Sequence, residues 1–280
     1  MNGQPKCILV GLAAREDFVT TPALGLAISL ARKNGAFLTV YALAPAFKQP
    51  PPTTSGSASA WVEMETEFLT SLTSSTARAA CKIITHAGIE CMVEAPASPF
   101  DSRTGRFVKL ARVNDLALLD AADAADTTQR TVIEDALFES GRPVLVVPEL
   151  ESVLVPRRVA IAWDGSGRSA RAVNDALPLL KAADAIFVVT VTGEKDLSAM
   201  APGAGLSIYL TRHGVSDCKL ATLSAMDGDV ASRLRAFMDE EAIEMLVMGA
   251  FVHSRFREAI LGGVTRSLLD TAHVPLFMAH

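Results

Sequence analysis

The sequence predicts an α/β protein in which two doubly wound, parallel five-stranded domains follow one another. Two observations support this prediction. Short apolar runs alternate with amphipathic stretches of helical length, a pattern typical of a parallel sheet covered on both faces. The second observation is that this pattern occurs twice, with the first domain at 1–150 and the second at 151–280.

The repeat is seen most clearly where each half begins. The apolar runs at 7–13 and 159–164 align when Ala13 is placed on Asp164, an offset of 164 − 13 = 151 residues. The next runs, at 37–41 and 188–192, give the same offset when Thr39 is placed on Thr190. Two elements with one offset favour an internal duplication over chance similarity.

The remaining elements follow in order. Thr21 and Pro22 are typical of an N-cap and a first helical residue, so we expect a helix at 21–34, with a partner at 169–182. Long helical periodicity covers 61–86, after a loop at 44–60 rich in Pro and Ser. Strands are expected at 115–119 and 244–248, and at 143–147 and 275–279. The terminal pair should lie at sheet edges and pair with each other, making an intramolecular pseudo-dimer.

Composition excludes several classes of function. With 280 residues, 50% hydrophobic and 20% charged, the chain can bury a large core. No apolar run approaches the ~20 residues that a membrane span needs. A net charge of −5 argues against a nucleic-acid partner. The four cysteines lack CxxC spacing and the histidines are scattered, so we expect no metal site and a reduced, cytoplasmic protein.

The stretch 245–266 carries the strongest functional signal. An apolar run ends on Gly249, a basic loop follows, and two glycines then open an amphipathic segment. A strand feeding such a loop and a helix N-terminus presents backbone N–H groups and a helix dipole to a phosphate. The alternative is a plain connection whose glycines serve only the turns. The candidate residues after Gly249 are His253, Arg255, Arg257, Gly262, Gly263, Val264 and Thr265.

At these residues the chain resembles the universal stress proteins in their tandem two-domain form. Nucleotide-binding members carry glycine, two residues, glycine, nine residues, glycine, then Ser or Thr. Gly249 and Gly262 fill the first and third positions, whereas Val252 stands at the second and Gly263 at the Ser/Thr position. Asp164 matches the aspartate that such members place beside adenosine. A β-branched residue at the second position disfavours a positive φ or a close approach of the backbone to phosphate.

The resemblance implies an adenine nucleotide alpha hydrolase-like, Rossmann-like fold, with homodimerisation through other surfaces left open. It implies a non-catalytic stress-response protein whose second domain binds ATP or another adenine nucleotide. The site residues it implies are Ala162, Trp163, Asp164, Val191, Met248, Gly249, His253, Arg255, Gly262, Gly263, Val264 and Thr265.

Two other functions compete with this one. Residues 165–170 read GSGRSA, the outline of a dinucleotide fingerprint, which would suit an NAD- or ATP-using enzyme. The alternative there is a strand-to-helix turn with Asp164 or Ser166 near the cap. The third function is a protein-interaction module whose ligand site has decayed.

The two halves differ at the proposed site. The first half has Ala13 at the position of Asp164, and its glycine-free loop at 120–126 carries Asp120, Asp123 and Asp126. Carboxylates repel an anion, so we expect a nucleotide in the second domain only.

Overall fold

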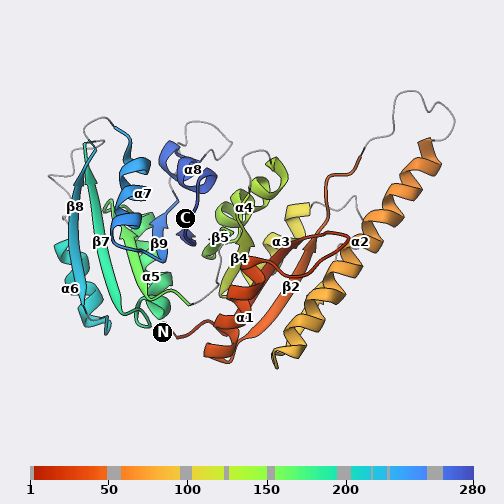
Figure 1. The fold of residues 1–280 in the computed structure, drawn as a ribbon, viewed down its shortest axis with the longest axis horizontal. Helices are drawn as coiled ribbons and strands as arrows, with labels where there is room; N and C mark the ends of the chain where they lie inside the picture. The colour runs from red at the N-terminus through yellow and green to blue at the C-terminus, as the bar shows by residue number, and fades with distance from the viewer. Residues whose placement is uncertain are drawn as a thin grey trace.

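In the part of the chain that the structure describes, each half folds as five strands that alternate with four helices (Figure 1). The structure is a computed structural model that describes residues 3–48, 58–94, 103–122, 126–149, 155–193, 203–215, 217–225, 228–250 and 261–280. The first half contains β1 (Cys7–Ala13), α1 (Pro22–Asn34), β2 (Phe37–Leu43), α2 (Ala58–His86), β3 (Cys91–Glu94), α3 (Arg103–Arg112), β4 (Leu116–Asp120), α4 (Thr127–Glu139) and β5 (Val144–Val147). The second contains β6 (Arg158–Ala162), α5 (Gly167–Leu180), β7 (Ala185–Thr192), α6 (Ala204–Arg212), β8 (Cys218–Ser224), α7 (Val230–Glu240), β9 (Met245–Gly249), α8 (Gly263–Asp270) and β10 (Leu276–Ala279).

The strands form one ten-stranded sheet in the order β3-β2-β1-β4-β5-β10-β9-β6-β7-β8. Within each half every neighbouring pair is parallel, and the order is the same when each half is read from its outer edge. The halves join through β5 and β10, which pair antiparallel with Phe277 opposite Leu145. The expected pairing of the two terminal strands is therefore confirmed, because each apolar edge covers the other.

Local sequence explains where the helices begin. The Thr21 hydroxyl accepts the N–H of Leu24 at the start of α1, and Pro22 occupies the first helical position, as expected. Helix α2 begins three residues before the expected 61 and ends at His86. Helix α5 begins two residues before the expected 169, and Pro178 lies within its last turn.

Two apolar layers run across both halves. Helices α1, α2, α5 and α6 bury side chains against one face of the sheet, and α3, α4, α7 and α8 bury theirs against the other. Leu145 and Phe277 belong to the first layer, whereas Val146 and Leu276 belong to the second. The core is thus continuous through the β5–β10 seam on both faces. None of the described helices combines the length and apolar character that crossing a bilayer requires.

Side chains near the ends of helices also cross the seam. Arg130 of α4 forms an ion pair with Asp270 of α8. The Arg171 guanidinium of α5 donates to the backbone carbonyl of Gly141. The Phe138 and His280 rings meet edge to face, with centroids 5.1 Å apart. The two halves therefore share polar and aromatic contacts as well as a sheet.

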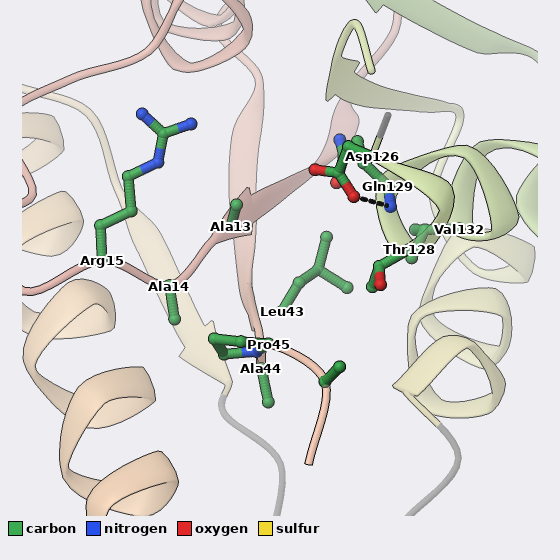
Figure 2. A pocket seen from close by; sticks show the side chains of 11 residues that line it. Ala13, Ala14, Arg15, Leu43, Ala44, Pro45, Asp126, Thr128, Gln129 and Val132 are labelled. Atoms are coloured by element: carbon green, nitrogen blue, oxygen red, sulfur yellow. Dashed lines mark hydrogen bonds between the residues drawn. The ribbon is translucent and has the colours of Figure 1, made fainter. Parts of the chain in front are cut away.

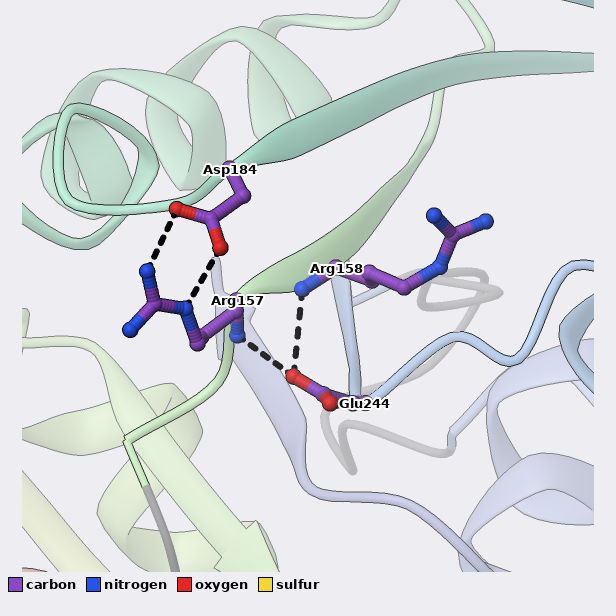
Figure 3. Close-up of polar contacts among 4 residues, drawn as sticks. All are labelled: Arg157, Arg158, Asp184 and Glu244. Carbon is purple, nitrogen blue, oxygen red and sulfur yellow. Dashed lines mark hydrogen bonds and ion pairs between the residues drawn. The ribbon is translucent and has the colours of Figure 1, made fainter.

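A pair of carboxylates shows that the repeat extends to side-chain hydrogen bonding. Asp115 accepts the backbone N–H groups of residues 6 and 7, at 2.8 and 3.0 Å, where β1 begins. Glu244 accepts those of Arg157 and Arg158 where β6 begins (Figure 3). Asp115 immediately precedes the central strand β4, and Glu244 immediately precedes β9. Each carboxylate thus fixes the start of the neighbouring strand, β1 or β6, by accepting two backbone N–H groups there.

Strand register corrects one part of the expected repeat. Ile8 lies opposite Leu116 and Val159 opposite Met245, which confirms the offset of 151 for β1 and β6. However, Leu38 is the β2 partner of Ile8, and Ile186 is the β7 partner of Val159. The alignment of Thr39 with Thr190 is therefore wrong by three residues. An odd slip also exchanges the two faces of a strand, and the two threonines lie on opposite faces of the sheet.

Candidate functional site

In each half the strand order reverses between two central strands, β1 and β4 in the first half and β6 and β9 in the second. Ligands of open α/β sheets bind outside the carboxyl ends of the strands at such a point. Ala162 and Met248 are register partners there, at the ends of β6 and β9. The fold therefore brings the Trp163–Asp164 loop beside Gly249, as the sequence predicts.

Asp164 and Ser166 organise the turn after β6. Asp164 Oδ1 accepts the N–H of Ser166 at 2.9 Å, and Ser166 Oγ accepts the N–H of Ser169 at 3.2 Å as the N-cap of α5. Gly165 supplies the positive φ, 71°, that this turn requires. These capping bonds are those of a strand-to-helix turn, the alternative to a dinucleotide fingerprint at 165–170.

Gly249 has a packing role that the sequence did not predict. A Cβ at this position would lie 2.5 Å from the backbone nitrogen of Ser169 and 2.7 Å from the carbonyl carbon of Arg168. The N-terminus of α5 therefore fills the space that a side chain would take. The close backbone approach that we expected for a ligand is made here by the protein itself.

The N-terminus of α8 is the second part of the site. Gly262 is its N-cap, with extended backbone (φ −62°, ψ 153°), and within the described part of the chain no side chain caps it. A Cβ at Gly263 would meet nothing within 4 Å. Thr265 is fully buried, and Val264 is half-buried. Val191 is half-buried near the end of β7, whereas Val252, His253, Arg255 and Arg257 lie outside the described residues.

The first half contains a cavity of about 230 Å³ at the carboxyl end of its sheet (Figure 2). It lies between the carboxyl ends of β1 and β2 and the N-terminal turn of α4. Ala13, Leu43 and Val132 form part of its apolar wall, and Asp126 and Gln129 line it at the start of α4.

The walls of this cavity correspond to the site that the sequence places in the second half. By strand register, Ala13 corresponds to Asp164, and Leu43 to Val191. Helices α4 and α8 correspond as well, because the third, sixth and seventh residues after each N-cap are buried. When the two N-caps are aligned, Asp126 corresponds to Gly262, Thr128 to Val264 and Gln129 to Thr265.

Two carboxylates occupy the helix N-termini of the first half. Asp126 Oδ1 accepts the N–H of Gln129 at 2.9 Å and caps α4. Asp120 Oδ1 accepts the N–H of Ala23 at 2.8 Å, in the first turn of α1. Their counterparts in the second half, by register and capping position, are Gly262 and Gly249. The first half thus supplies its own anions where the second half has glycines. Asp123 lies outside the described residues.

Asp120 makes the stability of the first half depend on pH. Burial raises the pKa of its carboxyl above 3.8, although the Ala23 N–H, the Thr21 hydroxyl and Arg15 oppose the shift. Because the pKa of Asp120 is higher in the folded state than in the unfolded state, protonated Asp120 favours folding. Its contribution to the free energy of unfolding is fully present below the unfolded-state pKa and is lost as pH rises through the folded-state pKa. We expect wild type to lose stability relative to Asp120→Asn over that window. Urea titrations at stepped pH measure this, and a pH-independent difference between the two proteins would contradict it.

Sequence reasoning missed the capping roles of Asp120 and Asp126, which it treated only as repelling charges. The segment Asp126-Thr127-Thr128-Gln129 has the spacing of a capping box, so the cap of α4 could have been predicted from nearby sequence. The role of Asp120 could not, because its partner Ala23 is 97 residues away in the chain. Within the described ranges, no group of three or more His, Cys, Asp or Glu residues could hold a metal ion.

The fold and the switch-point site define the class of protein: a doubly wound α/β protein duplicated within one chain. Residues 156–280, in the second half of the chain, match the model of the Universal stress protein family. No curated protein matches the sequence.

Solved structures extend the similarity to the whole chain. A universal stress protein from Archaeoglobus fulgidus DSM 4304 is 16% identical, with a TM-score of 0.67 over 97% of both chains. A functionally unknown protein from Pseudomonas aeruginosa PAO1 is 12% identical, with a TM-score of 0.61 over 98% of this chain and 92% of its own. At these identities the similarity concerns the fold alone, and it covers both halves of the chain.

Proposed function

We propose that the protein is a non-catalytic stress-response protein that binds one adenine nucleotide in its second half. The family of residues 156–280 supports the stress-response role. The observation that carries the binding proposal is the contrast between α4 and α8. Asp126 caps α4, whereas Gly262 leaves the N-terminus of α8 without a side-chain cap among the described residues.

A phosphate suits this helix end for two reasons. Backbone N–H groups in the first turn of a helix lack intrahelical partners, and the helix dipole is positive there. In the sequence, Arg255 and Arg257 precede Gly262 by seven and five residues, and His253 by nine, so the segment that leads to this helix is basic. In the first half Asp126 already holds the equivalent N–H group, so a phosphate there would face a carboxylate.

The nucleoside would lie toward the end of β6. Asp164 lies just after β6, and its carboxylate accepts the Ser166 N–H. An ionised carboxylate only accepts hydrogen bonds, so its partners on a nucleoside would be the ribose hydroxyls. A dinucleotide on the 165–170 turn is less well supported, because Ser166 and Asp164 already occupy N–H groups at the start of α5.

Gly262→Asp tests the proposal by giving α8 the cap that α4 has. We expect calorimetric titration to show at most one equivalent of ATP, ADP or AMP per wild-type chain. In the variant we expect affinity to fall about tenfold, or about 1.4 kcal/mol, because the new carboxylate takes the phosphate position. The extended backbone of residue 262 suits any side chain, and an aspartate N-cap favours the helix, so the fold should be kept.

Gly262→Asn is the matched control, since asparagine has the same size and caps a helix without charge. It should bind clearly more tightly than Gly262→Asp. Equal losses in the two variants would attribute the effect to bulk rather than charge. Two equivalents bound per wild-type chain, or unchanged affinity in Gly262→Asp, would refute the proposed site.

A further inference from the structure

Two thiols lie side by side at the outer edge of the first half. Cys81 is on α2 and Cys91 is on β3, with their Sγ atoms 3.5 Å apart. Both side chains are partly accessible. A disulfide has an S–S length of about 2.05 Å, so the two sulfurs need to approach by about 1.5 Å. The pair is thus close enough to be joined without rearranging the sheet.

Cys81 also opens onto a basic surface hollow. The hollow has a volume of about 530 Å³ and is lined by Arg78, Cys81, Lys82, Thr85 and His86, all from α2. Cationic groups therefore flank the sulfur on both sides along the helix, and a reagent that reaches Cys81 passes them. A negatively charged molecule is the natural occupant of such a surface.

The second half provides an internal comparison. Each outer helix is followed by a glycine with positive φ, Gly88 after α2 and Gly214 after α6. Seven residues before these glycines stand Cys81 and Ser207. Strand register equates Cys91 with Cys218, because they lie opposite Leu38 and Ile186. The equivalent pair is thus a serine and a cysteine. Burial raises the pKa of the Cys218 thiol, and a hydrogen bond with Ser207 opposes that rise, so the two side chains are in contact.

We propose that Cys81 and Cys91 form a redox-active pair that is oxidised by small disulfides carrying carboxylates. The Cys81 thiolate attacks the small disulfide, forms a mixed disulfide and releases one small thiolate. Cys91 then loses its proton to water and attacks the Cys81 sulfur, forming the Cys81–Cys91 bond and releasing the second small thiolate. The protein dithiol loses two electrons, and the small disulfide gains them.

The surroundings of Cys91 suit the second step of this sequence. Burial, followed by the hydrogen bond and the charge of Cys81, raises the pKa of Cys91 to about 11. Cys91 is therefore held as a thiol while Cys81 is free. In the mixed disulfide the Cys81 sulfur itself carries no charge, which removes part of that effect, and proximity then favours the intramolecular attack.

Glutathione disulfide, which carries carboxylates, is the probe for the test. The full chain is incubated with glutathione disulfide, and its free thiols are then alkylated. We expect mass spectrometry to show a chain in which Cys81 and Cys91 are not alkylated and have together lost two hydrogens. Trypsin should give peptide 79–82 joined to peptide 83–103.

Cystamine, a cationic disulfide, should react several times more slowly than glutathione disulfide, and added salt should reduce the difference between the two rates. If both cysteines stay open to alkylation, or each carries its own glutathione, the proposal is overturned. If cystamine reacts as fast as glutathione disulfide, the selectivity for carboxylates is overturned.

Three variants separate the roles of the two thiols. Cys91→Ser should stop at the glutathione adduct of Cys81. Cys81→Ser copies the pair of the second half and should form no disulfide at this edge. Ser207→Cys should gain a second disulfide, to Cys218, if the two sites share their geometry. A disulfide in Ser207→Cys without one between Cys81 and Cys91 would show that the first pair is not reactive.

Discussion

Replacing Phe277 with alanine is expected to lower the free energy of unfolding by about 3–5 kcal/mol. Phe277 is fully buried in β10 and lies opposite Leu145 of β5, where the two halves join. It belongs to the apolar layer that also holds α1 and α5. Truncation would remove an aromatic ring from this layer and leave a cavity at the seam that the neighbouring strands cannot close.

The two tryptophans report separately on the halves, because Trp61 lies in α2 and Trp163 follows β6. Denaturant titrations of Trp61→Phe and Trp163→Phe, each with and without Phe277→Ala, would therefore follow one half at a time. We expect both reporters to show the same loss, since sheet and core are continuous across the seam. Phe277→Leu is the control and should cost less than about 1.5 kcal/mol. A response of Trp163 alone would mean that the halves unfold independently.

Gly249→Ala is expected to cost about 3 kcal/mol of stability, at the upper end of what overpacking a core costs. The added methyl group would meet backbone atoms of Ser169 and Arg168 at 2.5 and 2.7 Å, and a backbone cannot rotate away as a side chain can. Helix α5 would have to move off the end of β9. Chemical denaturation measures the loss.

Gly263→Ala is the matched control for this prediction, because nothing lies within 4 Å of the added Cβ. It should leave stability unchanged or raise it by up to about 1 kcal/mol, since alanine favours a helix over glycine. Similar effects of the two substitutions would show that packing does not explain Gly249. Retained stability with lost nucleotide binding in Gly249→Ala would instead assign this glycine to the ligand.

Much of the fold could be predicted because it depends on short-range chemistry. The expected limits of β1 match the observed ones, and Thr21 and Pro22 begin α1 as a cap and a first residue should. The repeat was found from β1 and β6, where the apolar pattern is distinctive. The predicted alignment of β2 with β7 was wrong, because runs of Thr and Val match one another at several registers. There the neighbouring strands decide the alignment, with Leu38 and Ile186 as the equivalent residues.

By itself, the sequence determined the doubly wound class, the duplication, the apolar terminal strands and the contrast between a glycine-bounded and an aspartate-rich loop. These features follow from periodicity, capping and charge, which act over a few residues. Only the tertiary structure decided that Asp120 accepts a backbone N–H in the first turn of α1, that Gly249 makes room for α5, and that Cys81 lies beside Cys91. Each of these relations joins two elements, and the distance between elements is set by the packing of the whole sheet, which no local pattern contains.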